Sequence, residues 1–347
     1  MERVDQPAAP GVCRDPFAEA APGISGGSAR PVPESGKAEA PVPAGARREL
    51  HSSLESLDAL RVEWDALLEQ YAGATPFCTW EWLATWWRAY AQNDRLLVLA
   101  ARDASAALIG LAPLALSTER SCGVALRTLR LMGDGSHDSD NLDLPVRPGS
   151  EAEFSQALID WIREHSREWD VGRLCTLPAQ SPVGGRLLAR LQALGWHVRT
   201  STRPHTVLAL PETWEGYLKG LSSNERSKIG RRMRRVEKLY DVRVRKCAEP
   251  AELGPALDAL FDLHGKHWRQ RGLPGSFQLP ARRRFYRELA PLLLARQRLE
   301  FWLLELDGGS SPRSSPCGTA IRSTGCRRGS TRNTRRTASA TFCAATC

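Results

Sequence analysis

Residues 222–246 read SSNERSKIGRRMRRVEKLYDVRVRK, and within this stretch a helical pattern gives way to a strand pattern. Ser222 followed three residues later by Glu225 is a capping-box pair, which satisfies free backbone N–H groups where a helix begins. The apolar residues then recur at helical spacing and share one face: Ile229, Met233, Val236 and Tyr240. We therefore predict a helix over 222–240 and a short strand at Val242–Arg245.

Two more helices and a strand are predicted after this pair. Apolar residues at helical spacing run from Leu253 to Trp268, and Gly272 ends that helix. A further helix spans about 281–296. The run 299–306, LEFWLLEL, predicts a strand that leads into a turn at Asp307–Gly308.

The chain before residue 211 has its own series of elements. Apolar residues three and four apart predict a helix over 54–68, and a second helix carries the aromatic stripe Trp82, Trp86 and Trp87, which we interpret as core packing. Short apolar segments predict strands at 96–101, 108–116, 126–131, 173–177 and 206–210. Helices are predicted at 154–161 and 185–194, the second ended by Gly195. Strands that alternate with helices indicate a mixed α/β fold.

The positive charge of the chain is concentrated near its end. The 347 residues carry a net charge of +9, but residues 309–347 hold seven arginines and no Lys, Asp or Glu, which leaves +2 for the rest. A basic field that would indicate a nucleic-acid partner therefore depends mostly on this tail. No apolar run reaches the roughly 18–20 residues of a membrane span, and the N-terminus lacks the order of a signal peptide, so we expect a cytoplasmic protein without a membrane span.

Four quoted segments resemble the CelD-like proteins of cellulose biosynthesis, which are GNAT-superfamily acyltransferases related to the FemAB proteins. The segments are PFCTWEWLATWW, LRLMGDGSHDSDNLDL, DLHGKHWRQRG and EFWLLELDG, in that order, and the resemblance covers about residues 51–308. It implies tandem GNAT-like domains, each a twisted mixed sheet flanked by helices. It also implies transfer of an acyl group from acyl-CoA to an amine, as in acetyltransferases, with a role in exopolysaccharide or cell-envelope biosynthesis and a small-molecule or glycan-precursor amine as acceptor.

Two other functions remain open at this point. One is a FemAB-like transfer of an aminoacyl group from charged tRNA, and the other is a non-catalytic RNA-binding protein that uses the basic helix. Acyl transfer itself needs little covalent help, because a thioester is already activated. The enzyme mainly positions the amine, accepts its proton and stabilises the oxyanion.

The predicted helix over 222–240 carries the candidate donor-binding residues. Seven cations lie largely away from its apolar face, and five of them are our candidates for contact with the phosphates of CoA or of an RNA donor: Arg226, Lys228, Arg231, Arg232 and Arg235. The alternative is a solvated helix face, since runs of charge usually decorate surfaces.

A catalytic residue is harder to identify. His264 falls on the apolar stripe of its helix, which favours a core histidine, so His267 is the freer candidate for a general base. Segment 133–143 brings His137, Asp138, Asp140 and Asp143 together, but their spacing matches no metal-binding loop and a polar turn accounts for Asp138 and Asp140. We therefore expect no metal.

The tail departs from the family pattern abruptly. After Gly308 the family has a second strand, whereas this sequence becomes rich in Arg, Ser, Thr and Cys without periodicity. If each codon takes the third base of one residue and the first two of the next, Gly318–Gly325 permits Tyr-Gly-Tyr-Pro-Phe-Asp-Gly and Gly329–Arg336 permits Phe-Asp-Pro-Glu-Tyr-Ala-Pro. The second segment matches a recurring stretch of the family, so we interpret the tail as frame-shifted from near Gly308.

This interpretation completes the predicted domain organisation. Residues 1–48 form a disordered leader, because they are rich in Pro, Ala, Gly and Ser. An N-terminal GNAT-like domain spans 49–210 and an incomplete, truncated C-terminal one spans 211–308, followed by a disordered tail over 309–347. Of the nine cysteines, Cys317, Cys326, Cys343 and Cys347 lie in this tail at spacings that fit no zinc site, and we expect the other five to be reduced thiols.

Overall fold

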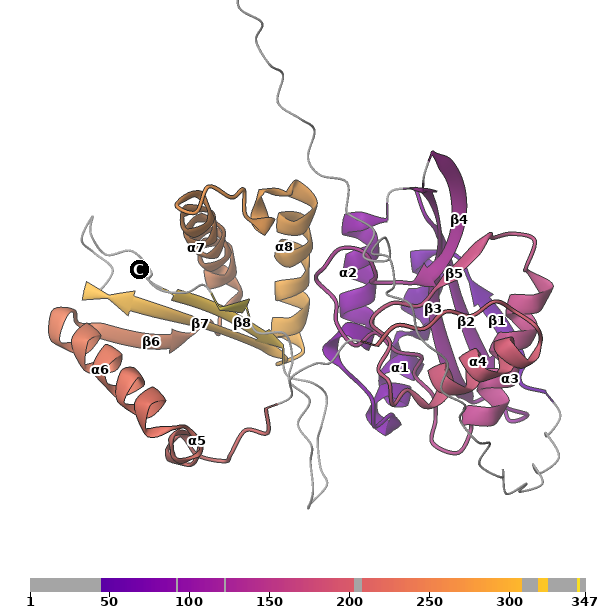
Figure 1. Ribbon diagram of the computed structural model, residues 1–347, viewed down its shortest axis with the longest axis horizontal. Coiled ribbons are helices and arrows are strands. Elements are labelled where there is room, and N and C mark those ends of the chain that lie inside the picture. Colours follow the sequence, from indigo (N-terminus) through magenta and orange to yellow (C-terminus); the bar gives the residue numbers. More distant parts are fainter. Residues whose placement is uncertain are drawn as a thin grey trace, which may run out of the picture. The chain divides into compact units, whose positions relative to one another are not determined.

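The computed structural model describes residues 45–91, 93–121, 123–202 and 208–307, together with the backbone of strands at 318–323 and 342–343. All of them belong to one compact unit, Val42–Cys347. This unit contains two separate sheets, each flanked by helices (Figure 1). The predicted mixed α/β fold class is therefore confirmed.

The first sheet has five strands in the order β1-β2-β3-β4-β5. These are β1 (Arg47–His51), β2 (Arg95–Arg102), β3 (Leu108–Ser121), β4 (Val124–Leu131) and β5 (Val171–Arg173). Neighbours pair antiparallel except β4 and β5, which are parallel and therefore need a crossover connection. Helix α3 (Glu151–Glu164) lies within that crossover.

Three further helices belong to the first half: α1 (Leu54–Gln70), α2 (Trp80–Tyr90) and α4 (Pro182–Ala193). Thr79 begins α2, since its hydroxyl accepts a hydrogen bond from the Trp82 backbone N–H at 3.3 Å. Trp82 and Trp86 are buried, and Trp87 packs partly buried against the core. The indole N–H of Trp82 donates to the Ser139 hydroxyl and that of Trp86 to the Ser136 hydroxyl, each at 2.9 Å. The core interpretation of the aromatic stripe is thus confirmed.

The second sheet has the order β6-β7-β8-β9. Its strands are β6 (Val242–Lys246), β7 (Leu299–Leu306), β8 (Gly318–Ser323) and β9 (Phe342–Cys343), all antiparallel to their neighbours. The helices of this half are α5 (Trp214–Gly220), α6 (Ser223–Leu239), α7 (Pro250–Arg269) and α8 (Pro280–Ala295). The short 3-10 turns at Pro76–Cys78 and Ser276–Gln278 complete the elements.

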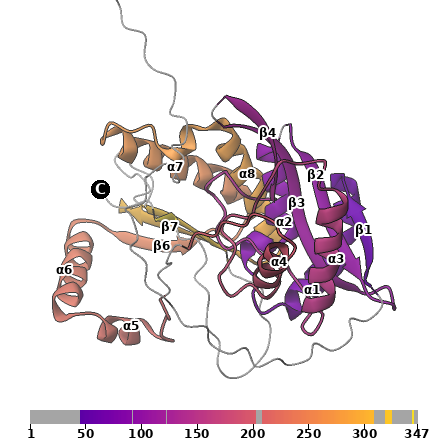
Figure 2. The ribbon, with the colours of Figure 1, turned by 45° about the vertical axis from the view of Figure 1, so that its right-hand side comes forward.

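The two faces of β7 differ because side chains alternate along a strand. Phe301 and Leu303 are buried, whereas Trp302 between them is 42 % exposed. Val244 of β6 pairs with Leu304 and is 64 % exposed, so it shares the face of Trp302. Figures 1 and 2 show α7 on one side of β6 and β7, with α5 and α6 on the other.

The first and second halves are joined by α2 and α8, which pack against each other. The rings of Trp82 and Phe285 meet edge to face with centroids 5.1 Å apart. The Arg284 guanidinium donates to the backbone carbonyl of Ala89 at 2.7 Å. Arg282 forms an ion pair with Asp138 at 2.9 Å, and both side chains are buried.

Several boundaries predicted from the sequence are wrong. Arg47 and Arg48 were placed in the disordered leader but begin β1, an edge strand whose largely exposed side chains hide its pattern. Residues 174–177 form no strand, since β5 ends at Arg173. Residues 208–210 form no strand either, and residues 206 and 207 of the same predicted strand lie outside the described residues. Helix α5 was not predicted, because its seven residues show no helical repeat long enough to detect. The division near residue 210 stays a prediction.

The tail is partly described. Strand β8 pairs with β7, from Leu299 opposite Ser323 to Leu304 opposite Gly318, and β9 pairs with β8. The prediction that 309–347 is disordered and that the sheet stops at β7 is therefore wrong for these two strands. Backbone pairing depends on N–H and C=O groups rather than on apolar periodicity, so the sequence pattern does not reveal it. The other residues of the tail lie outside the described part of the chain.

Candidate functional site

Helix α6 begins and ends close to the predicted residues. The Ser222 hydroxyl accepts a hydrogen bond from the Glu225 backbone N–H at 3.2 Å. In a capping box the glutamate side chain would also accept a hydrogen bond from the backbone N–H of Ser222. Here the Glu225 carboxylate instead accepts one from Lys228 Nζ at 2.8 Å. At Tyr240 the backbone becomes extended and the chain continues into β6.

The candidate donor-binding cations are brought together on this helix. Arg226 donates to the carbonyl of Leu218 at 3.5 Å, and Lys228 is paired with Glu225. The remaining three, Arg231, Arg232 and Arg235, are exposed and form no ion pair with any carboxylate of the described residues. Their charges are therefore available to a ligand.

The charges and the apolar residues of α6 occupy different faces. Successive helical residues turn by about 100°, so Lys228, Arg231, Arg235 and Lys238 form one stripe. The apolar stripe lies on the opposite side of the helix axis, and it is only half covered: Met233 is 46 % exposed, and Ile229 and Val236 are half-buried. No residue of α6 is buried.

His264 and His267 occupy the last two turns of α7. The His264 Nε2 accepts a hydrogen bond from Trp268 Nε1 at 2.8 Å, and its ring contacts that of Phe277 edge to face. Burial lowers the pKa of His264, and the charge of His267 adds to this effect. His264 is therefore a neutral packing residue, half-buried rather than fully in the core. His267 is half-buried with its ring edge to face with Trp268.

The structure does not bring the two candidate groups into one site. The cations lie on α6 and His267 lies on α7, and these helices lie on opposite sides of β6 and β7 in both views (Figures 1 and 2). A base at His267 and a donor held by α6 would thus act from different faces of the sheet.

Two of the candidate residues of segment 133–143, Asp138 and Asp143, have different partners. Asp138 is buried and accepts from the hydroxyl of Tyr90 at 2.7 Å as well as from Arg282. Asp143 is buried too, and accepts from Ser181 Oγ at 2.5 Å. Burial raises the pKa of Asp143 although this hydrogen bond opposes the shift. No group of three potential metal ligands occurs among the described residues.

A second buried carboxylate cluster was not predicted. Glu81 on α2 is buried, and its carboxylate accepts from Arg61 and pairs with Arg296, each at 2.9 Å. Burial opposes ionisation, but the hydrogen bond from Arg61 and the charge of Arg296 prevail and lower the pKa of Glu81. Arg296 follows α8, so this cluster also joins the two halves.

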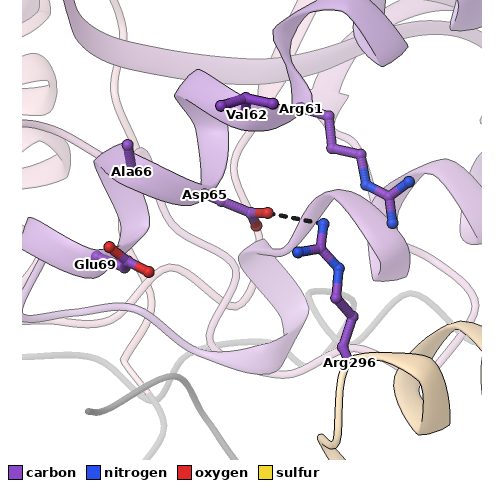
Figure 3. Close-up of a pocket in the computed structure, with 6 residues that line it drawn as sticks. All are labelled: Arg61, Val62, Asp65, Ala66, Glu69 and Arg296. Atoms are coloured by element: carbon purple, nitrogen blue, oxygen red, sulfur yellow. Dashed lines mark ion pairs between the residues drawn. The ribbon is translucent and has the colours of Figure 1, made fainter.

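A shallow pocket of about 560 Å³ borders this cluster (Figure 3). Its lining consists of Arg61, Val62, Asp65, Ala66, Glu69 and Arg296. Both arginines are already engaged, Arg61 with Glu81 and Arg296 with Asp65 at 2.8 Å. The pocket therefore offers no unpaired cation to an anionic ligand.

The described cysteines outside the tail are inert thiols. Cys78, Cys175 and Cys247 are free, as predicted, and burial raises the pKa of Cys78 and of Cys175 to about 11. A thiol with such a pKa is protonated at neutral pH and is a poor nucleophile. Cys13 and Cys122 lie outside the described residues.

Comparisons with known proteins place this geometry in context. A sequence model described as an acetyltransferase (GNAT) domain matches residues 223–310. No curated protein matches the chain. The crystal structure of FemX is similar, with a TM-score of 0.47 and 14% identity over 75% of this chain. The chain spans 58% of the length of that FemX structure.

Two further solved structures have lower scores. A mutant of the BH1408 protein from Bacillus halodurans has a TM-score of 0.30 and 13% identity, covering 47% of this chain and 99% of that chain. A fungal multi-domain GH3 beta-N-acetylglucosaminidase with a GCN5-related glucosamine N-acetyltransferase region has a TM-score of 0.29 and 15% identity, covering 82% and 28%. No described helix is long and apolar enough to cross a membrane. Residues 223–310, which contain α6 through β7, are thus similar to an acetyltransferase (GNAT) domain.

Proposed function

We propose that this protein is part of an enzyme that transfers an acyl group, most simply acetyl, from acyl-CoA to an amine. The observation that carries the proposal is the match of α6 through β7 to a GNAT acetyltransferase domain. In this reaction the amine nitrogen attacks the thioester carbonyl, the carbon–sulfur bond breaks and CoA leaves as the thiolate. The proton released from the amine must pass to a base or to water.

The cations of α6 are the proposed donor contacts. Arg231, Arg232 and Arg235 support this role because they are exposed and form no ion pair among the described residues. Arg226 and Lys228 extend the same surface toward the start of the helix. Guanidinium groups bind phosphate oxygens through paired, charge-assisted hydrogen bonds, which suits the phosphates of CoA.

The proposed catalytic base is His267 of α7. His267 keeps its place as the candidate because its side chain is not engaged in a hydrogen bond among the residues described. Its position on α7, across the sheet from α6, requires the amine to enter from the α7 side. Replacing His267 by Gln tests this role, since loss of a general base should lower kcat and remove that base's ionisation from the pH–rate profile.

The acceptor is proposed from the resemblance rather than from a pocket. A small-molecule or glycan-precursor amine, used in exopolysaccharide or cell-envelope biosynthesis, fits the CelD-like character of the sequence. The FemAB-like alternative replaces acyl-CoA by aminoacyl-tRNA, whose phosphates would meet the same cations. The two donors differ in the salt dependence of binding, which is much steeper for a nucleic acid that contacts many cations.

We also propose that the reading frame changes near Gly308. Two observations support this: the match to the acetyltransferase domain ends at residue 310, and the composition changes at the same place. Resequencing the gene across the codons of residues 307–311 tests it directly. An unbroken frame in an independent sequence would contradict the proposal.

The donor site is tested by binding in a chain with the restored frame. Replacing Arg231, Arg232 and Arg235 by Ala should weaken acyl-CoA binding, measured by calorimetry, more than it lowers the melting temperature. A matched control replaces Arg163, Arg186 and Arg190, which are exposed on α3 and α4. If the variant with the three α6 substitutions and the control variant bind the donor equally well, these cations do not contribute to donor binding.

A further inference from the structure

Charge is distributed unevenly along the chain. Residues 208–246 contain eleven Lys and Arg against five Asp and Glu, a net charge of +6. Because residues 1–308 sum to +2, the remainder of that region carries −4. The segment that holds α5, α6 and β6 therefore carries a net positive charge, as does the stretch 264–298, which has nine Lys and Arg against one Glu.

Exposed apolar side chains are concentrated in the same segment. Of the fifteen large apolar side chains that are exposed in the described part of the chain, seven lie between residues 208 and 244. They are Leu208, Leu210, Trp214, Met233, Leu239, Tyr240 and Val244. Trp214 is 48 % exposed, and its ring stacks on Tyr217 with centroids 5.4 Å apart. Exposed apolar side chains that gather in one region are typical of an interaction surface.

The two properties are arranged as two faces of one helix. In α6 the stripe Lys228, Arg231, Arg235 and Lys238 lies opposite the stripe Ile229, Met233 and Val236, and Tyr240 follows directly after the helix. Arg226 and Arg232 border the apolar stripe on its two sides. A cationic amphipathic helix with a partly uncovered apolar face has the composition of helices that lie in the plane of a membrane interface.

We propose that α6 docks the protein reversibly on an anionic lipid surface. The apolar stripe enters the boundary between headgroups and acyl chains, with Arg226 and Arg232 reaching lipid phosphates at its edges. Trp214 and Tyr217 add aromatic rings of the kind that settle at this interface. This inference goes beyond the proposed acyl transfer and does not depend on it.

A lipid surface fits better than RNA for a physical reason. Single-stranded nucleic acid binds where aromatic rings and cations share one face, so that bases stack while phosphates are neutralised. In α6 the apolar stripe consists of aliphatic and thioether side chains with Tyr240 at its end, and the main cation stripe points away from it. Nothing in that arrangement provides a row of stacking rings.

The test uses the full chain and sedimentation with unilamellar vesicles, without any acyl donor. One set of vesicles contains phosphatidylcholine with phosphatidylglycerol, and the other contains phosphatidylcholine alone. We expect binding to the anionic vesicles and far weaker binding to the neutral ones. Replacing Arg226 and Arg232 by Ala should weaken binding roughly 25-fold, since each cation near an anionic surface contributes about fivefold.

A second variant separates the apolar stripe from charge. Met233→Gln with Tyr240→Gln keeps the net charge and should weaken vesicle binding a few-fold. The matched control is Val62→Gln, which alters a side chain on α1 that is 80 % exposed. Circular dichroism establishes that each variant retains the helix content of the parent chain.

Three results would overturn the proposal. The first is equal binding of the parent chain to neutral and anionic vesicles. The second is unchanged vesicle binding of the Met233→Gln, Tyr240→Gln variant. The third is that single-stranded RNA displaces the parent chain from vesicles and that the same variant binds this RNA as tightly as the parent does. The last result would identify RNA as the partner. Because no donor is present, failure here leaves acyl transfer untouched, and failure of acyl transfer leaves vesicle binding untouched.

Discussion

The ion pair between Arg282 of α8 and Asp138 offers a sharp test of how the two halves are held together. The Asp138 side chain is fully buried, and Arg282 Nε lies 2.9 Å from its Oδ1. Tyr90 donates to the other carboxylate oxygen at 2.7 Å, and Tyr286 donates to Oδ1 at 3.2 Å. Arg282 also donates to the carbonyl of Ser136. Arg282→Met removes the only cation that pairs with Asp138 in the described residues.

The expected cost follows from what is left behind. Removing one partner of a buried pair typically costs about 3–5 kcal/mol, because the other charge stays buried without compensation. Two tyrosine hydroxyls still solvate Asp138, so we expect a value near the lower end, ~3 kcal/mol. That is a large share of a total stability of about 5–15 kcal/mol.

Urea unfolding followed by tryptophan fluorescence measures the change, since Trp82 and Trp86 lie in the same core. The control is Arg287→Met on the same helix, whose partner Asp258 is exposed and whose loss should cost about 1 kcal/mol or less. The double variant with Asp138→Asn should be less destabilised than Arg282→Met alone. If Arg282→Met costs no more than Arg287→Met, the buried pair does not hold α8 to the first half.

Three other predictions concern local features of the fold. Gly110→Ala places a methyl group 2.4 Å from the buried ring of Phe154, so we expect chemical unfolding to show a loss of about 1–3 kcal/mol, and an unchanged midpoint would refute this packing. Burial lowers the pKa of His51 and of His264 in the folded chain. As the pH falls, the unfolded chain therefore binds protons at these histidines at a higher pH than the folded chain does. The melting temperature should therefore be level above about pH 6.5 and fall below it, and a variant with Gln at both positions should fall less; equal slopes would contradict the assignment. Ser222→Ala removes the N-cap of α6 and should speed amide exchange in its first turn by a factor that corresponds to about 1 kcal/mol, whereas unchanged exchange would mean that the cap contributes nothing.

Much of the fold could be predicted because it depends on local periodicity. The strand over 299–306 agrees with β7 at both ends, and α6 differs from the prediction by one residue at each end. Elements without a clear repeat were missed: β1 is an exposed edge strand with two arginines, and α5 has seven residues. Strand β8 was missed because pairing with β7 does not require an apolar pattern.

The candidate site was predicted only in part. The run of cations identifies the exposed surface of α6, since charge is visible in composition. The sequence does not show that His267 and these cations lie on different sides of a sheet, because that relation is set by strand order. Nor does it show that Asp138 pairs with Arg282, a residue far along the chain that only packing of α2 on α8 brings near.

Isothermal calorimetry with CoA tests whether the donor site depends on the sequence after Gly308, by comparing the present chain with one whose reading frame is restored there. We expect the restored chain to bind CoA with a measurable heat and the present chain not to, because the acetyltransferase match stops at residue 310. If replacing Arg231, Arg232 and Arg235 by Ala weakens CoA binding by the restored chain, the phosphates of CoA contact α6. Equal binding of CoA by both chains would contradict the account, since the donor site would then be independent of the sequence that follows Gly308.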